Sequence, residues 1–425
     1  MTYHGDFQTL DAYMASVGVS AREAGSQLHT APADQRAQAI QRMTTALRDA
    51  EANILSANAQ DVETAKDNGT SGAMLDRLRL DPDRLSAIAD NLDSIAAQPD
   101  PIGATLESWT RPNGLRFEKV TVPIGVIAMI YESRPNVTAD AAALCIKSGN
   151  AVILRGGSEA VHSNRAIAAA VRSGLRQADL PEAAVQLLAT QDRAAVGHLL
   201  AGLDGHIDLI IPRGGKGLVA RVQAEARVPV LAHLDGLNTT YVHASADPIM
   251  ALDVIANAKM RRTGICGATE TVLVDAPIAR DTIPPLVERL EGLGCEVRGD
   301  ARASALSPMT AATDEDFDTE HLAPILNLAV VEHIDAALAH IAQHGSGHTD
   351  AILSEDPAAT ERFLAEVDSA IVMHNASTQF ADGGEFGFGA EIGIATGRLH
   401  ARGPVGAQHL VTTKYRVRGD GTLRA

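Results

Sequence analysis

The 425-residue chain is poor in cysteine, and its cysteines show no pattern of a disulfide framework or of a cysteine-ligated metal site. Its three cysteines, Cys145, Cys266 and Cys295, are an odd number and lie far apart without metal-ligand spacing. They argue against a disulfide framework and favour a reducing, cytosolic compartment.

Basic residues and long apolar segments are scarce as well. The 36 Lys and Arg residues are outnumbered by 53 Asp and Glu residues, and the net charge of -17 argues against non-specific binding to nucleic acid or anionic membranes. The N-terminus lacks the basic and apolar regions of a signal peptide. The longest apolar run, residues 120–131, is too short to span a bilayer and contains Pro123. We therefore expect a cytoplasmic protein with no nucleic-acid or membrane partner.

The length predicts two or three domains. Apolar side chains recur at helical spacing in the first hundred residues, and from Gly125 onward short β-runs alternate with helical stretches. The expected strands are residues 126–130, 151–154, 185–188 and 207–211. Repeated βαβ units indicate a parallel sheet covered by helices, and such sheets bind ligands at the carboxyl ends of their strands.

Two glycine-rich loops, residues 155–159 and 212–217, follow expected strands. Their glycines allow close backbone approach, and backbone N–H groups together with Arg155 and Lys216 suit phosphate groups. Plain turns are the alternative, because neither loop is a GxGxxG or Walker motif.

Cys266 lies in a glycine-flanked loop between a helical segment (253–260) and an apolar β-run (271–274). A thiol on a loop held by two regular elements is exposed yet fixed, as a nucleophile must be. Arg261 and Arg262 lie just upstream, and cationic neighbours favour the thiolate. The alternative is that Cys266 is a small buried hydrophobic residue.

Residues 107–122 alternate polar and apolar side chains around a turn at 111–114, which predicts a β-hairpin. Such an excursion often pairs with a partner chain. The tail contains a further β-like run at 408–415 that could pair with this hairpin as a small third unit.

Four long strings resemble the γ-glutamyl phosphate reductase family within the aldehyde dehydrogenase superfamily. They are YESRPNVTAD at 131–140, KSGNAVILRGG at 147–157, HGSGHTDAI at 344–352 and LHARGP at 399–404. The resemblance covers roughly residues 35–415. It implies NADPH-dependent reduction of L-glutamate 5-phosphate to L-glutamate 5-semialdehyde with release of phosphate, the second step of proline biosynthesis. It also implies a homo-oligomer, and a glutamate 5-kinase that would be a separate chain.

The implied fold is α/β and aldehyde dehydrogenase-like, with a Rossmann-like cofactor domain, an αβ catalytic domain and a small β oligomerisation flap. The cofactor domain would comprise residues 1–106 and 122–231, with a return segment near 376–403. The catalytic domain would comprise 232–375, and the flap 107–121 and 404–425.

The resemblance also implies roles for individual residues. Cys266 would attack the acyl phosphate to form a thioester, and Asn136 would donate to the developing oxyanion. Arg134 is a candidate partner for the charged groups of the substrate. Glu320 matches a glutamate that contacts the nicotinamide-side ribose; a solvated loop carboxylate is the alternative.

Cofactor preference is expected to depend on the first glycine-rich loop. Arg155 takes the place of a lysine near the adenosine ribose, and Ser158 replaces a glutamate of NAD-preferring members, although Glu159 is adjacent. The retained cation attracts the 2′-phosphate of NADPH, and the loss of the carboxylate removes a negative charge that would repel it. Both changes favour NADPH. The expected cofactor-binding residues are Arg155, Gly156, Ser158, Gly214, Gly215 and Glu320.

Two departures from the superfamily pattern bear on the reaction. Hydrolytic members carry a water-activating glutamate where this chain has the string 233–238, which contains none. Its absence favours acyl-phosphate reduction, whereas His233 as a replacement base would indicate a hydrolytic aldehyde dehydrogenase. Gly267 stands where these reductases often have asparagine. The backbone N–H of Gly267 could still face the oxyanion, but a role for a side chain at this position is in doubt.

His340, His344 and His348 are spaced four apart and could form a metal site, which would indicate a metal-dependent enzyme. Gly345 and Gly347 interrupt the helix between the last two, and the string belongs to the reductase resemblance, so we expect no metal. A catalytically inactive relative is a third possibility, which the intact Cys266 loop disfavours.

Overall fold

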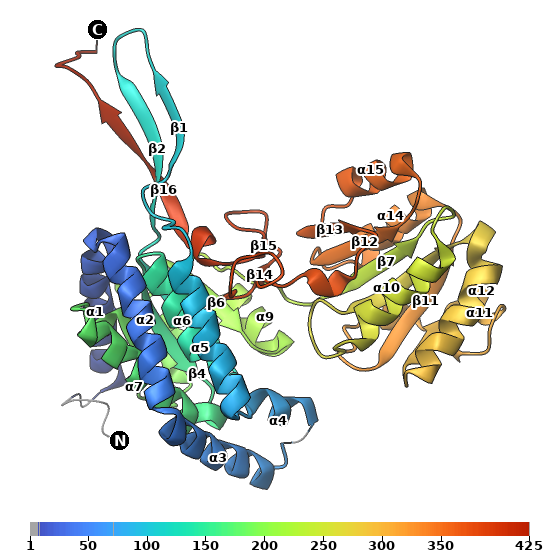
Figure 1. Ribbon diagram of the computed structural model, residues 1–425, viewed down its shortest axis with the longest axis horizontal. Coiled ribbons are helices and arrows are strands. Elements are labelled where there is room, and N and C mark those ends of the chain that lie inside the picture. Colours follow the sequence, from blue (N-terminus) through green and yellow to red (C-terminus); the bar gives the residue numbers. More distant parts are fainter. Residues whose placement is uncertain (1–6, 8, 71, 425) are drawn as a thin grey trace. The chain divides into compact units, whose positions relative to one another are not determined.

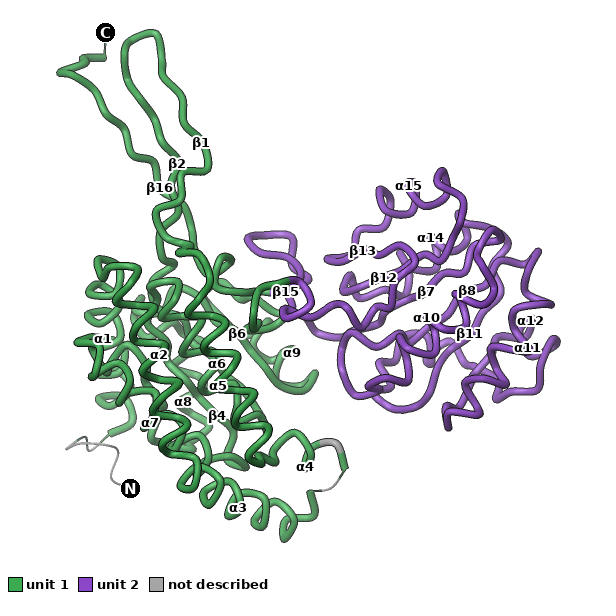
Figure 2. The backbone as a smooth tube through the Cα atoms, viewed as in Figure 1, with its two compact units in different colours: residues 1–232, 387–393, 405–425 green, residues 233–386, 394–404 purple. Residues whose placement is uncertain are grey.

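The computed structural model describes residue 7 and residues 9–70 and 72–424. The chain divides into two compact units (Figure 2). Unit 1 contains the described residues up to 232 together with 387–393 and 405–424, and unit 2 contains residues 233–386 and 394–404. Of the return segment expected near 376–403, residues 387–393 lie in unit 1 and the remainder in unit 2.

Unit 1 is built on a four-stranded parallel sheet in the order β5-β4-β3-β6, as the βαβ pattern predicted. Its strands are β3 (Val126–Tyr131), β4 (Ala151–Gly156), β5 (Val185–Leu187) and β6 (Leu209–Arg213). Its helices are α1 (Leu10–Thr30), α2 (Ala33–Asp49), α3 (Glu51–Asp67), α4 (Gly72–Leu78), α5 (Pro82–Ala97), α6 (Asn136–Lys147), α7 (Val161–Gln177), α8 (Ala194–Leu200) and α9 (Lys216–Glu225).

Side chains that alternate along β3 face opposite layers of helices. Val126, Ala128 and Ile130 pack in one cluster with α1, α8 and α9. Helices α6 and α7 cover the other face, and α2 and α5 lie outside them (Figure 1). The N-terminus of α5 is fixed because the Asp81 side chain accepts from the Arg84 N–H and proline opens the helix.

The predicted hairpin forms, and the tail strand pairs with it. β1 (Thr105–Thr110), β2 (Arg116–Pro123) and β16 (Val411–Arg418) make an antiparallel sheet that projects from the helical body of unit 1 (Figure 1). Trp109 stacks on Phe117 with ring centroids 5.3 Å apart and meets Tyr415 edge-on. Every residue of β1 is exposed, so this sheet buries little of its own apolar surface.

Unit 2 contains a seven-stranded parallel sheet in the order β10-β9-β11-β8-β7-β12-β13. Its strands are β7 (Asn238–Val242), β8 (Thr269–Asp275), β9 (Glu296–Gly299), β10 (Thr310–Ala311), β11 (Ile325–Val331), β12 (Thr349–Leu353) and β13 (Ile371–His374). A two-stranded ribbon, β14 (Ile394–Ala395) with β15 (Gly403–Pro404), lies in the same unit.

Helices cover both faces of this sheet. They are α10 (Pro248–Met260), α11 (Ala276–Gly292), α12 (Ala301–Ser304), α13 (Asp314–Phe317), α14 (Ile334–His344) and α15 (Pro357–Glu366). Apolar side chains of α10, α11 and α12 pack on one face and those of α14 and α15 on the other. No helix in the described part of the chain is long and apolar enough to cross a membrane.

Gly174 allows α7 to touch α2 backbone to backbone, since a Cβ there would lie 2.4 Å from the Met43 nitrogen. Gly174→Ala should therefore force the two helices apart and lower the free energy of unfolding by about 1–3 kcal/mol, measured by urea denaturation followed by circular dichroism. Gly197, in α8, has open space around it, so Gly197→Ala should be neutral or stabilising by up to about 1 kcal/mol. Equal effects of the two substitutions would contradict this account of the α2–α7 contact.

Candidate active site

The loop of Cys266, residues 261–268, joins α10 to β8 in unit 2, and a buried ion pair ties its two stems together. Lys259 Nζ, in the last turn of α10, lies 2.6 Å from Glu270 Oε2 in β8, and both side chains are almost fully buried. Removing one partner of such a pair leaves an uncompensated buried charge, so the pair holds both ends of the loop in place.

Asn238, which is fully buried at the start of β7, fixes the loop through side-chain hydrogen bonds. Its Nδ2 donates to the Cys266 carbonyl at 2.6 Å and to the Ala268 carbonyl at 2.9 Å. Its Oδ1 accepts from the Thr349 N–H at 3.1 Å, where β12 begins. Gly236 packs against the same carbonyl, because a Cβ there would lie 2.2 Å from Cys266 O. One amide thus joins the Cys266 loop to the start of β12.

Two histidines flank the thiol. The nearest ligand atoms of His233, Cys266 and His348 all lie within 4.8 Å of one another, and the imidazole rings meet edge to face at 5.0 Å. His233 Nδ1 lies 2.8 Å from the Ile394 carbonyl, which can only accept, so Nδ1 carries a proton and Nε2 is left for the thiol. His348 is fully buried directly before β12.

These histidines lower the pKa of Cys266 well below its usual range. Burial alone would raise the pKa, but the charge of His348 and the hydrogen bond to His233 favour the thiolate more strongly. The arginines that we expected to do this are not among the largest causes. Arg261 donates from Nη1 to Gln379 Oε1 at 3.2 Å and so braces the loop instead.

The site gathers at the amino ends of β8, β7 and β12, three neighbours in the sheet. This is the edge opposite to the one at which parallel sheets usually bind ligands. The amides of Cys266 and Gly267 donate no hydrogen bond to any other described residue, so both remain available to an anionic oxygen.

Glu320 lies near the thiol, in the same unit. Its Oε1 accepts from the Gly236 N–H at 3.0 Å. Burial raises its pKa, the Gly236 hydrogen bond lowers it, and the charge of Cys266 raises it further. Glu320 is therefore a partly buried carboxylate beside the nucleophile loop and not a solvated surface residue.

Asn136 and Arg134 lie in unit 1, where the chain passes from β3 into α6. Asn136 is the first residue of α6, and its Nδ2 donates to Asp140 Oδ2 at 2.9 Å. Burial raises the pKa of Asp140 to about 6, although Asn136 and the charge of Arg213 lower it. This contact orients the amide and leaves its second N–H free of any other described partner.

The first glycine-rich loop packs tightly in unit 1. Gly156 ends β4 where a Cβ would lie 2.2 Å from the Asn164 side chain, so this glycine permits α7 to approach the strand. Ser158 begins the turn that precedes α7. The adjacent Glu159 folds over Gly157 and accepts from the Ser133 N–H and hydroxyl, so its carboxylate is engaged within the protein.

The second loop leads into the N-terminus of α9 through Gly214 and Gly215. Glu132 Oε2 accepts from the Gly215 N–H at 3.0 Å, and a Cβ on Gly214 would lie 2.6 Å from the same oxygen. The Glu132 carboxylate thus accepts a hydrogen bond from a backbone N–H at a helix N-terminus, a position where such groups often bind phosphate. The glycines provide the space that it needs.

Arginines gather around the segment that follows β5. Arg155 Nη2 lies 3.4 Å from the Gln191 carbonyl, and Arg165 Nη2 lies 3.5 Å from the Ala189 carbonyl. Burial lowers the pKa of Arg155; the charge of Glu159 opposes that effect and the charge of nearby Arg193 adds to it. These cations and the α9 N-terminus fit the anionic groups of a dinucleotide.

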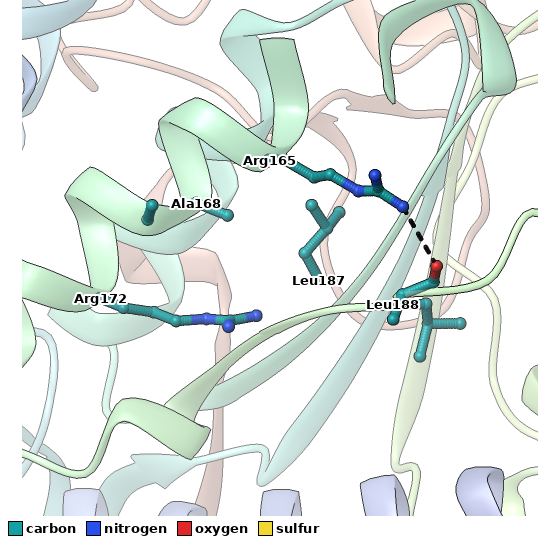
Figure 3. A pocket seen from close by; sticks show the side chains of 7 residues that line it. Arg165, Ala168, Arg172, Leu187 and Leu188 are labelled. Carbon is teal, nitrogen blue, oxygen red and sulfur yellow. Dashed lines mark hydrogen bonds between the residues drawn. The ribbon is translucent and has the colours of Figure 1, made fainter. Parts of the chain in front are cut away.

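A pocket of about 420 Å³ lies beside this segment, between α7 and the end of β5 (Figure 3). Arg165 and Arg172 extend from α7 across Leu187 and Leu188. A cavity with an apolar floor and a guanidinium at each end suits a flat or apolar group that carries negative charge.

The three histidines of the sequence-based metal hypothesis do not come together. His340 and His344 remain neighbours on α14, with ring centroids 4.5 Å apart, and His344 Nδ1 contacts Asp318 Oδ1 at 2.8 Å. His348 instead meets Cys266 and His233. Sequence reasoning did not pair His348 with Cys266, because it considered this histidine only in the metal hypothesis and within the family string.

Comparisons with known proteins show which family the chain resembles. The aldehyde dehydrogenase family matches residues 11–317. The chain is 62% identical to a gamma-glutamyl phosphate reductase of Caulobacter vibrioides over 97% of this chain and 100% of that protein. It is 61% identical to a protein of the same name from Novosphingobium aromaticivorans, over 95% of each.

Solved structures agree as well. The chain resembles a crystal structure of gamma-glutamyl phosphate reductase from Thermotoga maritima with a TM-score of 0.94 at 41% identity, covering 97% of this chain and 100% of that one. An acetylating aldehyde dehydrogenase from Geobacillus thermoglucosidasius, at 19% identity, has a TM-score of 0.70 over 99% of this chain and 100% of that one and shares the fold.

The lowered pKa of Cys266 predicts that alkylation by iodoacetamide is already fast at pH values below about 8.5, the pKa of a free thiol, because the thiolate is the reactive form. His348→Gln removes the imidazole whose interaction favours the thiolate and should shift the rate profile to higher pH. The measurement is the modification rate of the Cys266 peptide by mass spectrometry.

Cys145 and Cys295 serve as internal controls, since burial raises both of their pKa values and they should stay unmodified in the folded protein. Superimposable profiles for wild type and His348→Gln would show that His348 does not favour the thiolate.

Proposed function

Because this chain belongs to the γ-glutamyl phosphate reductase family of aldehyde dehydrogenases, we propose that it reduces L-glutamate 5-phosphate to L-glutamate 5-semialdehyde with NADPH, releasing phosphate. The observation that carries the proposal is the thiol of Cys266, held by Asn238 and flanked by His233 and His348. An acyl phosphate is an activated acyl donor, and a thiolate at this position is the nucleophile that it requires.

The first step uses groups of unit 2. The Cys266 thiolate attacks the acyl carbon, the carbon–oxygen bond to phosphate breaks, and a thioester remains on the sulfur. The free amides of Cys266 and Gly267 are suited to donate to the oxyanion that develops. Asn136, whose amide is oriented by Asp140, is the side-chain donor that family membership implies.

A thioester that is to be reduced must be protected from water. Glu320 and Glu270 are engaged, by the Gly236 N–H and by Lys259 respectively. His233 belongs to the string 233–238, which stands where hydrolytic relatives carry the water-activating glutamate, but its Nδ1 is bound to Ile394 and its other nitrogen faces the thiol. We assign His233 to the thiol, with proton transfer to and from the sulfur as its role.

The nicotinamide cofactor, when bound, supplies the hydride. Arg155 and Ser158 would hold its adenosine end, and Gly214 and Gly215 at the α9 N-terminus its phosphates, which would replace Glu132 at the Gly215 N–H. Glu320 is the proposed contact to the nicotinamide-side ribose, and Arg134 the proposed partner of the substrate carboxylate. The arginines near residues 189–193, and the engagement of Glu159 by Ser133, favour a cofactor with an additional 2′-phosphate.

The reverse reaction tests the chemistry. Glutamate 5-semialdehyde and NADP⁺ should yield NADPH only when inorganic phosphate is present, because phosphate must resolve the thioester. Cys266→Ala should reduce the rate by more than about 10³-fold, whereas Cys295→Ala, at a buried thiol, should retain it. Turnover without phosphate would mean that water resolves the thioester, and the chain would then be a hydrolytic aldehyde dehydrogenase.

The same assay measures cofactor preference. NADP⁺ should be preferred to NAD⁺ in kcat/KM by at least about tenfold, and Arg155→Ala should narrow this ratio by weakening a charge-assisted contact. Arg176→Ala is the matched control, because Arg176 lies on α7 but pairs with Glu182 on the surface. An unchanged ratio in Arg155→Ala would exclude this residue from cofactor discrimination.

We also propose that the β1-β2-β16 flap joins copies of the chain into a homo-oligomer. Leu106, Trp109, Tyr415 and Val417 are exposed apolar side chains on this small sheet, and β1 and β16 each have an unpaired edge.

Replacing Trp109 and Tyr415 by serine should lower the mass measured by light scattering, while the Gly197→Ala variant keeps it. The proposal fails if wild type is a monomer at micromolar concentration.

A further inference from the structure

We propose that His233, Cys266 and His348 form a binding site for one zinc ion, and that its occupation reversibly blocks the nucleophile. The three side chains each offer one ligand atom, and these atoms lie within 4.8 Å of one another. In the part of the chain that the structure describes, no other group of three metal-binding side chains converges in this way.

The orientation of both imidazoles is that of metal ligands. The Ile394 carbonyl fixes a proton of His233 on Nδ1, so Nε2, the nitrogen that faces the thiol, is the ring atom that can bind a metal in exchange. His348 Nδ1 contacts Thr349 Oγ1 at 2.9 Å, and its Nε2 is buried without a hydrogen-bond partner of ordinary geometry. Each ring is thus held at its Nδ1, by the Ile394 carbonyl or the Thr349 hydroxyl. His348 Nε2 is a buried polar atom that a ligand can satisfy.

The donor set selects the class of ion. Two imidazole nitrogens and one thiolate suit Zn²⁺, which binds tetrahedrally at such sites and accepts water as a fourth ligand. Mg²⁺ and Ca²⁺ prefer oxygen ligands and are not expected here. Binding forms a Zn–S bond, releases the sulfur-bound proton where the thiol is protonated, and changes no oxidation state.

Zinc and the acyl phosphate would compete for the sulfur of Cys266. A sulfur bonded to zinc cannot attack an acyl phosphate, so the metal is an inhibitor and not a cofactor of the proposed reaction. Removal of zinc by a chelator restores the free thiolate. The fixed geometry that prepares Cys266 for attack therefore also makes it a metal ligand.

Cobalt(II) titration of the full-length protein tests the site independently of catalysis. Wild type should bind one Co²⁺ per chain with a sulfur-to-cobalt charge-transfer band and the intense visible absorption of a tetrahedral site, and Zn²⁺ should abolish both signals. Cys266→Ser should lose the charge-transfer band. His233→Gln and His348→Gln should each weaken affinity by about 10- to 100-fold or more.

Matched controls are His340→Gln, at the histidine pair on α14, and Cys295→Ser, at a buried thiol; both should bind Co²⁺ as wild type does. Circular dichroism of each variant confirms folding. A charge-transfer band that persists in Cys266→Ser, or unchanged affinity in both histidine variants, would overturn the proposal and indicate adventitious binding only.

The outcome is separable from that of the proposed function. A cobalt site in a protein without phosphate-dependent turnover would leave the metal proposal standing and remove the reductase proposal. The other outcome is a protein that shows phosphate-dependent turnover, lacks the cobalt signals and is not inhibited by micromolar Zn²⁺. That outcome would support the reductase proposal and overturn the metal proposal.

Discussion

The geometry of the site depends on the side-chain amide of Asn238. It donates to two carbonyls of the loop that carries Cys266 and accepts from the first amide of β12. The thiol and His348 come from distant parts of the chain, and this one residue fixes both with respect to the sheet. Since Asn238 is fully buried, each lost hydrogen bond would leave an unsatisfied polar group and cost about 1–3 kcal/mol. The arrangement is therefore rigid before any ligand arrives.

The charge of the thiolate is balanced locally. A buried thiol would ordinarily have a raised pKa, yet His348 and His233 reverse the direction of the shift. The two histidines act on the sulfur at short range, because the ligand atoms of all three residues lie within 4.8 Å of one another. Glu320, in contrast, has its pKa raised beside the same sulfur, as expected where two acidic groups share a site.

Much of the fold could be predicted from local pattern. The βαβ alternation, the hairpin at 107–122 and its pairing with the tail follow from periodicity and turn residues, and structure and comparisons confirm them together with the family resemblance. The thiolate's partners could not be predicted in this way. His233, Cys266 and His348 meet only because β7, β8 and β12 are neighbours in the sheet, and strand order is not encoded by spacing along the chain. The sequence instead pointed to Arg261 and Arg262, which are not among the groups with the largest effect on the thiol.

The hydrogen bond from His233 to Ile394 has a consequence for biosynthesis. Ile394 belongs to a ribbon that returns to unit 2 after the chain has left it, and its partner strand ends at Pro404. A nascent chain on the ribosome can complete the sheet of unit 2 before this ribbon has emerged. Until then one imidazole beside Cys266 lacks the carbonyl that fixes its tautomer. The contribution of His233 to the thiolate is thus completed only when almost the entire chain has been made, whereas His348 is in place once β12 has joined the sheet.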